Sequence, residues 1–170
     1  NMAYAPNVNA VEYLAYEIMP LVWKQIPNAK LYIAGATPDP RVKKTASDKI
    51  IISGWLDDMR DAYAQSRIFI APMRIGTGLQ NKLLEAMCMK LPCITTSLAN
   101  GSLHAKEDEE ILVGNNEQEL ANHIISLLTD KEKAETIAQN GYDFVHRVYD
   151  WGMATNIMEE AMGLKLKIES

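Results

Sequence analysis

Two glycines separated by one residue, Gly76 and Gly78, mark the passage from a predicted strand into a predicted helix. Glycine lets the backbone approach a ligand closely, and the free N–H groups and dipole of a first helical turn favour negative charge. Arg74 precedes this turn and Lys82 follows it, so two cations flank the glycines. The combination is suited to binding phosphate, although an ordinary strand-to-helix turn would also explain the two glycines.

The predicted helix after the glycines extends this interpretation. Gly78, Lys82 and Glu85 are spaced i, i+4 and i+7 and therefore share one helix face. Glu85 lies about 10 Å along the axis from Gly78, which is close to the separation of a diphosphate and the ribose of the same nucleotide. A carboxylate there can accept hydrogen bonds from vicinal hydroxyls. The competing interpretation is an ordinary surface ion pair between Lys82 and Glu85.

Common nucleotide-binding motifs do not fit this segment. A Walker A loop needs Gly-Lys-Ser/Thr, and a dinucleotide fingerprint needs a glycine where Asn81 stands. No predicted strand ends in a cluster of aspartates, which argues against a receiver domain and against a carboxylate-bound Mg²⁺. The two cysteines, Cys88 and Cys93, lack partners at metal-ligand spacing and are expected to be free buried thiols. We therefore expect neither an ATPase nor a dehydrogenase, and no bound metal.

Composition narrows the class of ligand. The 170 residues include 17 Lys and Arg against 22 Asp and Glu, a net charge of −5 that argues against a general nucleic-acid binder. Residues 62–106 nevertheless carry five basic side chains and one acid, so this segment is +4 and the remainder −9. Apolar runs are far shorter than a membrane-spanning helix requires, about 20 residues. The pattern favours one small anionic ligand.

The hydrophobic pattern predicts an α/β fold with a Rossmann-like parallel sheet covered by helices on both faces. A first helix runs from Val11 to Ile26, with a kink or restart at Pro20. The alternation that follows comprises strands at 30–34, 49–53, 67–71, 92–96 and 110–113, and helices at 57–65, 79–90, from 116, and at 131–148.

Both ends of the chain carry expectations about domain organisation. Doubly wound folds begin with a strand, so we expect that strand to have been left out upstream, or to survive only as a tail at 1–4. The Rossmann-like domain is expected to cover 1–149. A further amphipathic helix, capped by Asp150, is predicted for 150–170.

Several motifs in order along nearly the whole chain resemble the carboxyl-terminal half of GT-B glycosyltransferases of the family-4-like, group 1 type. They are Asn1–Pro6 with Asn7, Val11 and Tyr13; Leu31–Gly35; Ile51–Trp55; Ile70–Pro72; Arg74–Gly78; Lys82–Met87; Leu91–Thr96; and Tyr149–Trp151. The resemblance implies a domain that binds a sugar-nucleotide donor and supports transfer without a metal, mostly with retention of anomeric configuration.

Roles for individual residues follow from the same resemblance. Glu85 would bind the ribose, and the amides of Gly76, Thr77, Gly78 and Leu79 would hold the diphosphate. The segment Gly54-Trp55-Leu56 would lie against the base, although Trp55 could equally pack into the protein. The helix from Asp150 would cross back to the amino-terminal half.

The chain departs from that pattern in two places. Many relatives carry a second glutamate eight residues before the ribose-binding one, and Thr77 stands there, near the expected donor sugar. The Arg and Lys that relatives place after the first strand are absent from 1–9. We expect Arg74 and Lys82 to supply the missing charge, while donor-sugar identity stays open.

These observations predict a UDP- or GDP-sugar donor-binding domain of a bacterial glycosyltransferase of the hexosyltransferase type, involved in surface glycan synthesis. The full-length protein would be cytoplasmic or peripheral at the inner membrane. Its amino-terminal half would bind an acceptor glycan or lipid-linked sugar, so this chain alone would be inactive. The alternatives are a noncatalytic interaction domain with a degenerate donor site, and an inverting transferase or epimerase of the same fold.

Overall fold

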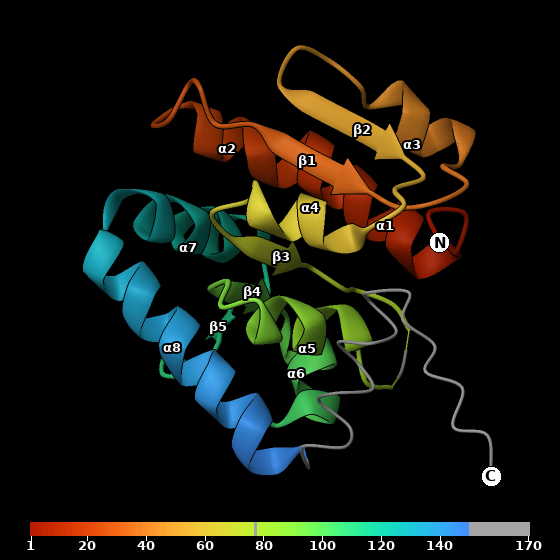
Figure 1. Cartoon of the computed structure of the whole chain (residues 1–170). Coiled ribbons are helices and arrows are strands. Elements are labelled where there is room, and N and C mark those ends of the chain that lie inside the picture. The colour runs from red at the N-terminus through yellow and green to blue at the C-terminus, as the bar shows by residue number, and fades with distance from the viewer. Residues whose placement is uncertain (77, 150–170) are drawn as a thin grey trace, which may run out of the picture.

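Short parallel strands alternate with helices along the chain, as the hydrophobic pattern predicts (Figure 1). The structure is a computed structural model that describes residues 1–76 and 78–149. Its strands are β1 (Leu31–Ala34), β2 (Ile50–Gly54), β3 (Phe69–Ala71), β4 (Cys93–Thr95) and β5 (Leu112–Val113). Its helices are α1 (Ala5–Tyr13), α2 (Met19–Trp23), α3 (Pro40–Lys44), α4 (Met59–Ala64), α5 (Asn81–Cys88), α6 (Ser97–Leu103), α7 (Glu117–Thr129) and α8 (Lys131–Val148).

The strands form two parallel sheets rather than one continuous sheet. β1 pairs with β2, and β3, β4 and β5 pair in that order. Within residues 1–76 and 78–149 no ladder joins β1 to β3. The strands of both sheets nevertheless run in the same direction, so their carboxyl ends reach one side of the molecule (Figure 1).

Helices cover both faces of the three-stranded sheet. On one face, α7 packs against α2 and β4, and a core that includes Ile18, Ile94, Leu112 and Leu120 joins the two sheets. On the other face, α5 and α8 pack against each other and against β4 around Leu84, with α6 contributing to the same core. This is the layered α/β arrangement that strands buried on both faces require.

The first helix begins earlier than predicted, and a new α-helix starts at Met19 with Pro20 in its first turn, as the predicted restart requires. Helix α1 starts at Ala5, where Pro6 occupies the first turn, instead of Val11. A π-helical turn (Leu14–Ile18) joins α1 to α2 just before Pro20. Proline lacks the N–H that would close the preceding turn, and a wider turn accommodates the loss. Residues 1–4 form a turn, so the expected strand tail is absent there.

One further helix start is confirmed in detail, whereas other helices differ from the prediction. Helix α7 begins after Asn116, whose side chain accepts a hydrogen bond from the Glu119 N–H at 2.9 Å, as the capping pattern predicts. Helices α3 and α6 were not predicted, and α4 and α5 are shorter than expected. The predicted helix from Asp150 lies outside the described residues.

No helix among the described residues is both long enough and apolar enough to cross a membrane.

Candidate functional site

The loop that follows β3 is fixed at its base by the end of β4. The buried hydroxyl of Thr95 donates to the Ala71 carbonyl at 2.8 Å, and that of Thr96 donates to the Met73 carbonyl at 2.6 Å. These two bonds connect neighbouring strands where each one ends. The loop therefore leaves the sheet from a rigid base at the carboxyl edge, where open α/β sheets bind their ligands.

Both glycines of this loop have backbone conformations that favour glycine. Gly76 has φ +98° and Gly78 has φ +95°, a region that side chains with a Cβ rarely adopt. A Cβ at Gly76 would lie 3.3 Å from Pro6, whereas one at Gly78 would meet no described atom within 4 Å. The backbone at Gly78 therefore faces open space that a ligand can approach.

Helix α5 begins without a side-chain cap. Its N-cap residue, Gln80, forms no capping hydrogen bond, in contrast to Asp58 at α4 and Asn116 at α7. The orphan N–H groups of a first turn need an acceptor from a side chain, water or a ligand. The predicted helix is confirmed, but it starts at Asn81 and not at Leu79.

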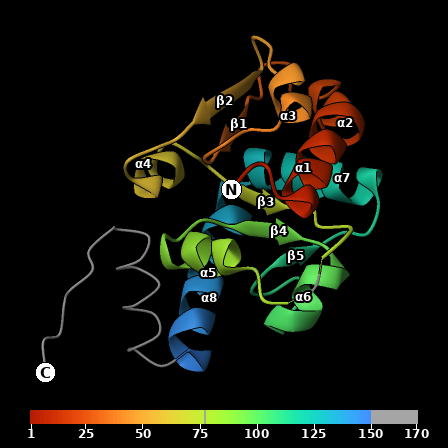
Figure 2. The same cartoon turned by 90° about the vertical axis from the view of Figure 1, so that its right-hand side faces the viewer.

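The two cations beside the glycines both reach α1. The half-buried Lys82 ammonium donates to Asn7 Oδ1 at 2.6 Å, and burial lowers the pKa of this lysine. Arg74 Nε donates to Asn9 Oδ1 at 3.2 Å, and its guanidinium lies 3.9 Å from the centre of the Tyr13 ring. These contacts bring both positive charges to α1, near the start of the chain. Figure 2 shows α1 beside the N-terminus.

Arg74 also forms an ion pair, which matters for its predicted role. Its Nη1 lies 3.5 Å from Glu17 Oε1, and both side chains are about half exposed. An exposed pair of this kind contributes little to stability and is easily exchanged. Neutralisation of phosphate by Arg74 stays a prediction that requires the arginine to exchange this partner.

Glu85 does not pair with Lys82. No ion pair within 4.0 Å joins the two side chains among the described contacts, so the surface-pair interpretation is wrong. Glu85 Oε2 instead accepts a hydrogen bond of 2.7 Å from the hydroxyl of Tyr63, on α4. Tyr63 is buried, and burial followed by the charge of Glu85 raises the pKa of its hydroxyl. The cation and the carboxylate of the predicted face are thus held by different partners.

The segment after β2 contributes an exposed aromatic ring. Trp55 is 73% exposed, and its indole N–H donates to Asp57 Oδ1 at 3.2 Å. The interpretation of Trp55 as a packing residue is therefore wrong, and its ring is accessible. Leu56 beside it is partly buried. Thr77 lies outside the described residues, so its place near a donor sugar stays a prediction.

Three residues of this constellation were missed by sequence reasoning: Asn7 and Asn9 as partners of the two cations, and Tyr63 as the partner of Glu85. The only signal for Tyr63 was its type. A tyrosine on the buried face of a helix needs a partner for its hydroxyl. Sequence alone does not show that this partner is 22 residues away.

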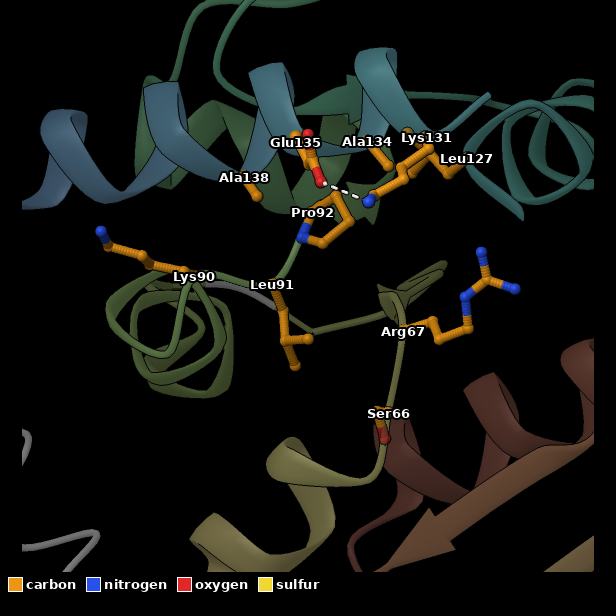
Figure 3. A pocket seen from close by; sticks show the side chains of 10 residues that line it. All are labelled: Ser66, Arg67, Lys90, Leu91, Pro92, Leu127, Lys131, Ala134, Glu135 and Ala138. Atoms are coloured by element: carbon orange, nitrogen blue, oxygen red, sulfur yellow. Dashed lines mark ion pairs between the residues drawn. The ribbon is translucent and has the colours of Figure 1, made fainter. Parts of the chain in front are cut away.

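A shallow pocket of about 320 Å³ lies away from these residues, among the segments that precede β3 and β4. Arg67, Pro92 and Lys131 line it, and Lys131 forms an ion pair with Glu135 at 3.4 Å (Figure 3). It is at the amino edge of the sheet, opposite the glycine loop. Among the described residues no three His, Cys, Asp or Glu side chains gather as metal ligands would.

Known proteins resemble this chain in sequence and in fold. A Klebsiella pneumoniae protein, known as an uncharacterized 44.6 kDa protein in the cps region, is 27% identical over 159 residues. The match covers 88% of this chain but 41% of the relative, so the chain spans less than half of that protein.

Two solved structures share the fold. The C-terminal domain of LpcC, a glycosyl transferase group 1 family protein of Francisella tularensis, has a TM-score of 0.68 at 24% identity, covering 83% of this chain and 80% of that one. Anabaena Alr3699/HepE, in complex with UDP and glucose, has a TM-score of 0.71 at 16% identity, covering 87% of this chain and 44% of that one.

The parallel α/β architecture is that of the carboxyl-terminal half of GT-B transferases, as the resemblance in sequence predicted. The sequence profile of the family Glycosyl transferases group 1 matches residues 1–130. The chain belongs to that family.

Proposed function

We propose that the chain binds the nucleotide part of a UDP- or GDP-sugar, as the donor-binding domain of a bacterial glycosyltransferase that builds surface glycans. The observation that carries the proposal is the separation of Lys82 from Glu85. These two groups share one face of α5, each forms its hydrogen bond with a different neighbour, and Gly78, expected on the same helix face, lies in the loop before the helix. A cation near the open loop and a carboxylate further along the helix suit a diphosphate and a ribose.

The positions of the cations support a compensation within the site. Relatives place basic residues after the first strand, whereas this chain has Asn7 and Asn9 in that region. The cationic groups of Lys82 and Arg74 lie within hydrogen-bonding distance of these two asparagines. Arg74, in the loop after β3, and Lys82, on α5, thus bring positive charge to the segment where relatives carry their basic residues.

The comparisons support the choice of ligand and pathway class. A protein of the same fold has been solved with UDP and glucose, which favours a uridine nucleotide of the two. The sequence relative from a cps region supports a role in surface polysaccharide synthesis. Transfer itself would require the amino-terminal half, because the reacting groups must be aligned and shielded from water. We propose a retaining, metal-independent hexosyl transfer for the full-length protein, with an acceptor glycan or lipid-linked sugar.

Titration of the 170-residue chain with UDP and with GDP tests the binding proposal. Backbone amide NMR shifts should change around residues 76–85 and near Trp55 at up to millimolar nucleotide, with the larger response to UDP. A chain whose spectrum is unchanged by either nucleotide at that concentration does not have the proposed site.

Glu85→Ala separates donor binding from a noncatalytic interaction domain. Loss of hydrogen bonds from ribose hydroxyls to a charged carboxylate is expected to weaken UDP binding roughly 10- to 100-fold. Glu135→Ala is the matched control at the amino edge, and it should leave UDP affinity unchanged. Isothermal titration gives the affinities, and thermal unfolding checks that both variants keep the fold. Equal affinity of Glu85→Ala and the unmodified chain would favour the noncatalytic interpretation.

A further inference from the structure

The hydrogen bond between Tyr63 and Glu85 joins two segments of the candidate site that lie 22 positions apart in the sequence. Tyr63 lies on α4, which follows the Gly54-Trp55-Leu56 turn, and Glu85 lies on α5, which follows the glycine loop. The tyrosine is 5% exposed, and its ring packs against Phe69 of β3 at 5.9 Å between centroids. Its hydroxyl reaches Glu85 from a rigid, buried position.

This contact occupies one oxygen of the carboxylate and leaves the other for a ligand. Tyr63 donates to Oε2, and no other hydrogen bond or ion pair engages the Glu85 side chain within residues 1–76 and 78–149. Glu85 itself is only partly buried. Burial and the charge of Glu85 keep the tyrosine hydroxyl protonated, so it remains a donor.

We propose that Tyr63 is a positioning residue for ribose recognition, holding Glu85 so that its free oxygen meets the vicinal hydroxyls of the nucleotide. This inference rests on the proposed donor-binding function. A glutamate side chain that is ordered before the ligand arrives loses less conformational freedom on binding. Since α4 also begins just after Trp55, the same short helix connects the base-contacting segment with the ribose carboxylate.

Tyr63→Phe tests the role because it deletes the hydroxyl and retains the ring that contacts Phe69. Affinity for UDP is expected to fall roughly fivefold, the equivalent of one hydrogen bond. Affinity for 2′,3′-dideoxy-UDP, which lacks both ribose hydroxyls, should not change. Tyr32→Phe on β1 is the control: it removes a tyrosine hydroxyl from a neighbouring element and should alter neither affinity. Thermal unfolding confirms that each variant is folded.

A double-mutant cycle excludes an indirect structural effect. In a Glu85→Ala background, Tyr63→Phe should cause no further loss of UDP affinity, because the tyrosine acts through the carboxylate. An equal loss for UDP and dideoxy-UDP, or a loss that persists in the Glu85→Ala background, would overturn the positioning role. So would unchanged UDP affinity in Tyr63→Phe while the unmodified chain binds UDP, and that result would leave the donor site standing. If the unmodified chain does not bind UDP at all, the donor site and the positioning role fail together.

Discussion

The two edges of the β3–β5 sheet differ in what they offer a ligand. The carboxyl edge carries two glycines in left-handed conformations, an uncapped helix start and a carboxylate fixed by a buried tyrosine. The amino edge carries the shallow pocket near Pro92, where Lys131 already pairs with Glu135. Arg67 and Lys90 also line this pocket, and neither forms an ion pair among the described residues.

Helix direction accounts for part of the difference. In a parallel α/β fold the helices begin at the carboxyl edge and end near the amino edge, so their positive dipole ends gather on the side of the glycine loop. Beside the pocket, α4 and α5 end but α8 begins, so helix ends of both signs lie there. The uncapped start of α5 and the fixed charges of Lys82 and Glu85 are therefore what sets the carboxyl edge apart.

The largest effect that separates the edges should come from removing one lysine at each. Lys82→Met is expected to weaken UDP binding roughly 10- to 100-fold, because it removes a charged hydrogen-bond donor near the loop. Lys131→Met, at the pocket, should leave UDP affinity unchanged. Isothermal titration at low ionic strength measures both. The comparison between the edges fails if the two variants lose affinity equally.

The same lysine predicts a pH dependence. Burial lowers the pKa of Lys82 below its ordinary value of 10.5, so its charge is lost at a lower pH than that of an exposed lysine. UDP affinity should therefore weaken as the pH rises toward the lowered pKa of Lys82, and Lys82→Met should abolish this dependence.

Alanine substitutions at Gly78 and Gly101 test whether the left-handed backbone conformation of the glycine loop is required at the carboxyl edge. A Cβ at Gly78 or at Gly101 of α6 would meet no described atom within 4 Å, but only Gly78 has a positive φ. Gly78→Ala should destabilise the fold by about 1–2 kcal/mol, whereas Gly101→Ala should stabilise it by about 0.5–1 kcal/mol. Urea unfolding measures both changes. Shifts of the same sign would show that the left-handed turn is not needed.

The smallest effect concerns the missing cap of α5. Gln80→Asp should raise stability by about 1 kcal/mol, because its carboxylate would cap the first turn. UDP affinity should drop severalfold, since the new charge competes with phosphate for the same N–H groups. Gln80→Asn supplies a neutral cap and should stabilise with a smaller loss of affinity. Stabilisation by Gln80→Asp without any loss of affinity would mean that phosphate does not bind there.

The features predicted correctly from the sequence are those that depend on residues close together in the chain. Strand and helix alternation, the Asn116 cap and the shared face of Lys82 and Glu85 all depend on residues a few positions apart. Helix α6 was missed because its sequence, Ser97–Leu103, contains Asn100 and Gly101, which are poor helix formers. Tertiary contacts hold it: Leu103 is buried, and Asn100 bonds to the backbone of Ala105 in both directions.

The partners of the site residues could not be predicted for the same reason. Tyr63 meets Glu85 across 22 positions, and Lys82 meets Asn7 across 75. Such contacts depend on how α1, α4 and α5 pack on the sheets, and no local pattern encodes that packing. The sequence located the candidate site on one helix, whereas the structure adds the two neighbouring helices that fix its charges.

The division of the strands into two sheets has a consequence for how the chain behaves in solution. Among the described strands, β1 and β3 each have a ladder partner on one side only. In the usual order of a doubly wound sheet, 3-2-1-4-5-6, the strand that precedes the first helix lies between these two. An unpaired strand edge is a template for any extended chain that can complete its hydrogen bonds. The free edges of β1 and β3, like those of β2 and β5 among the described strands, are therefore places where an added strand can pair.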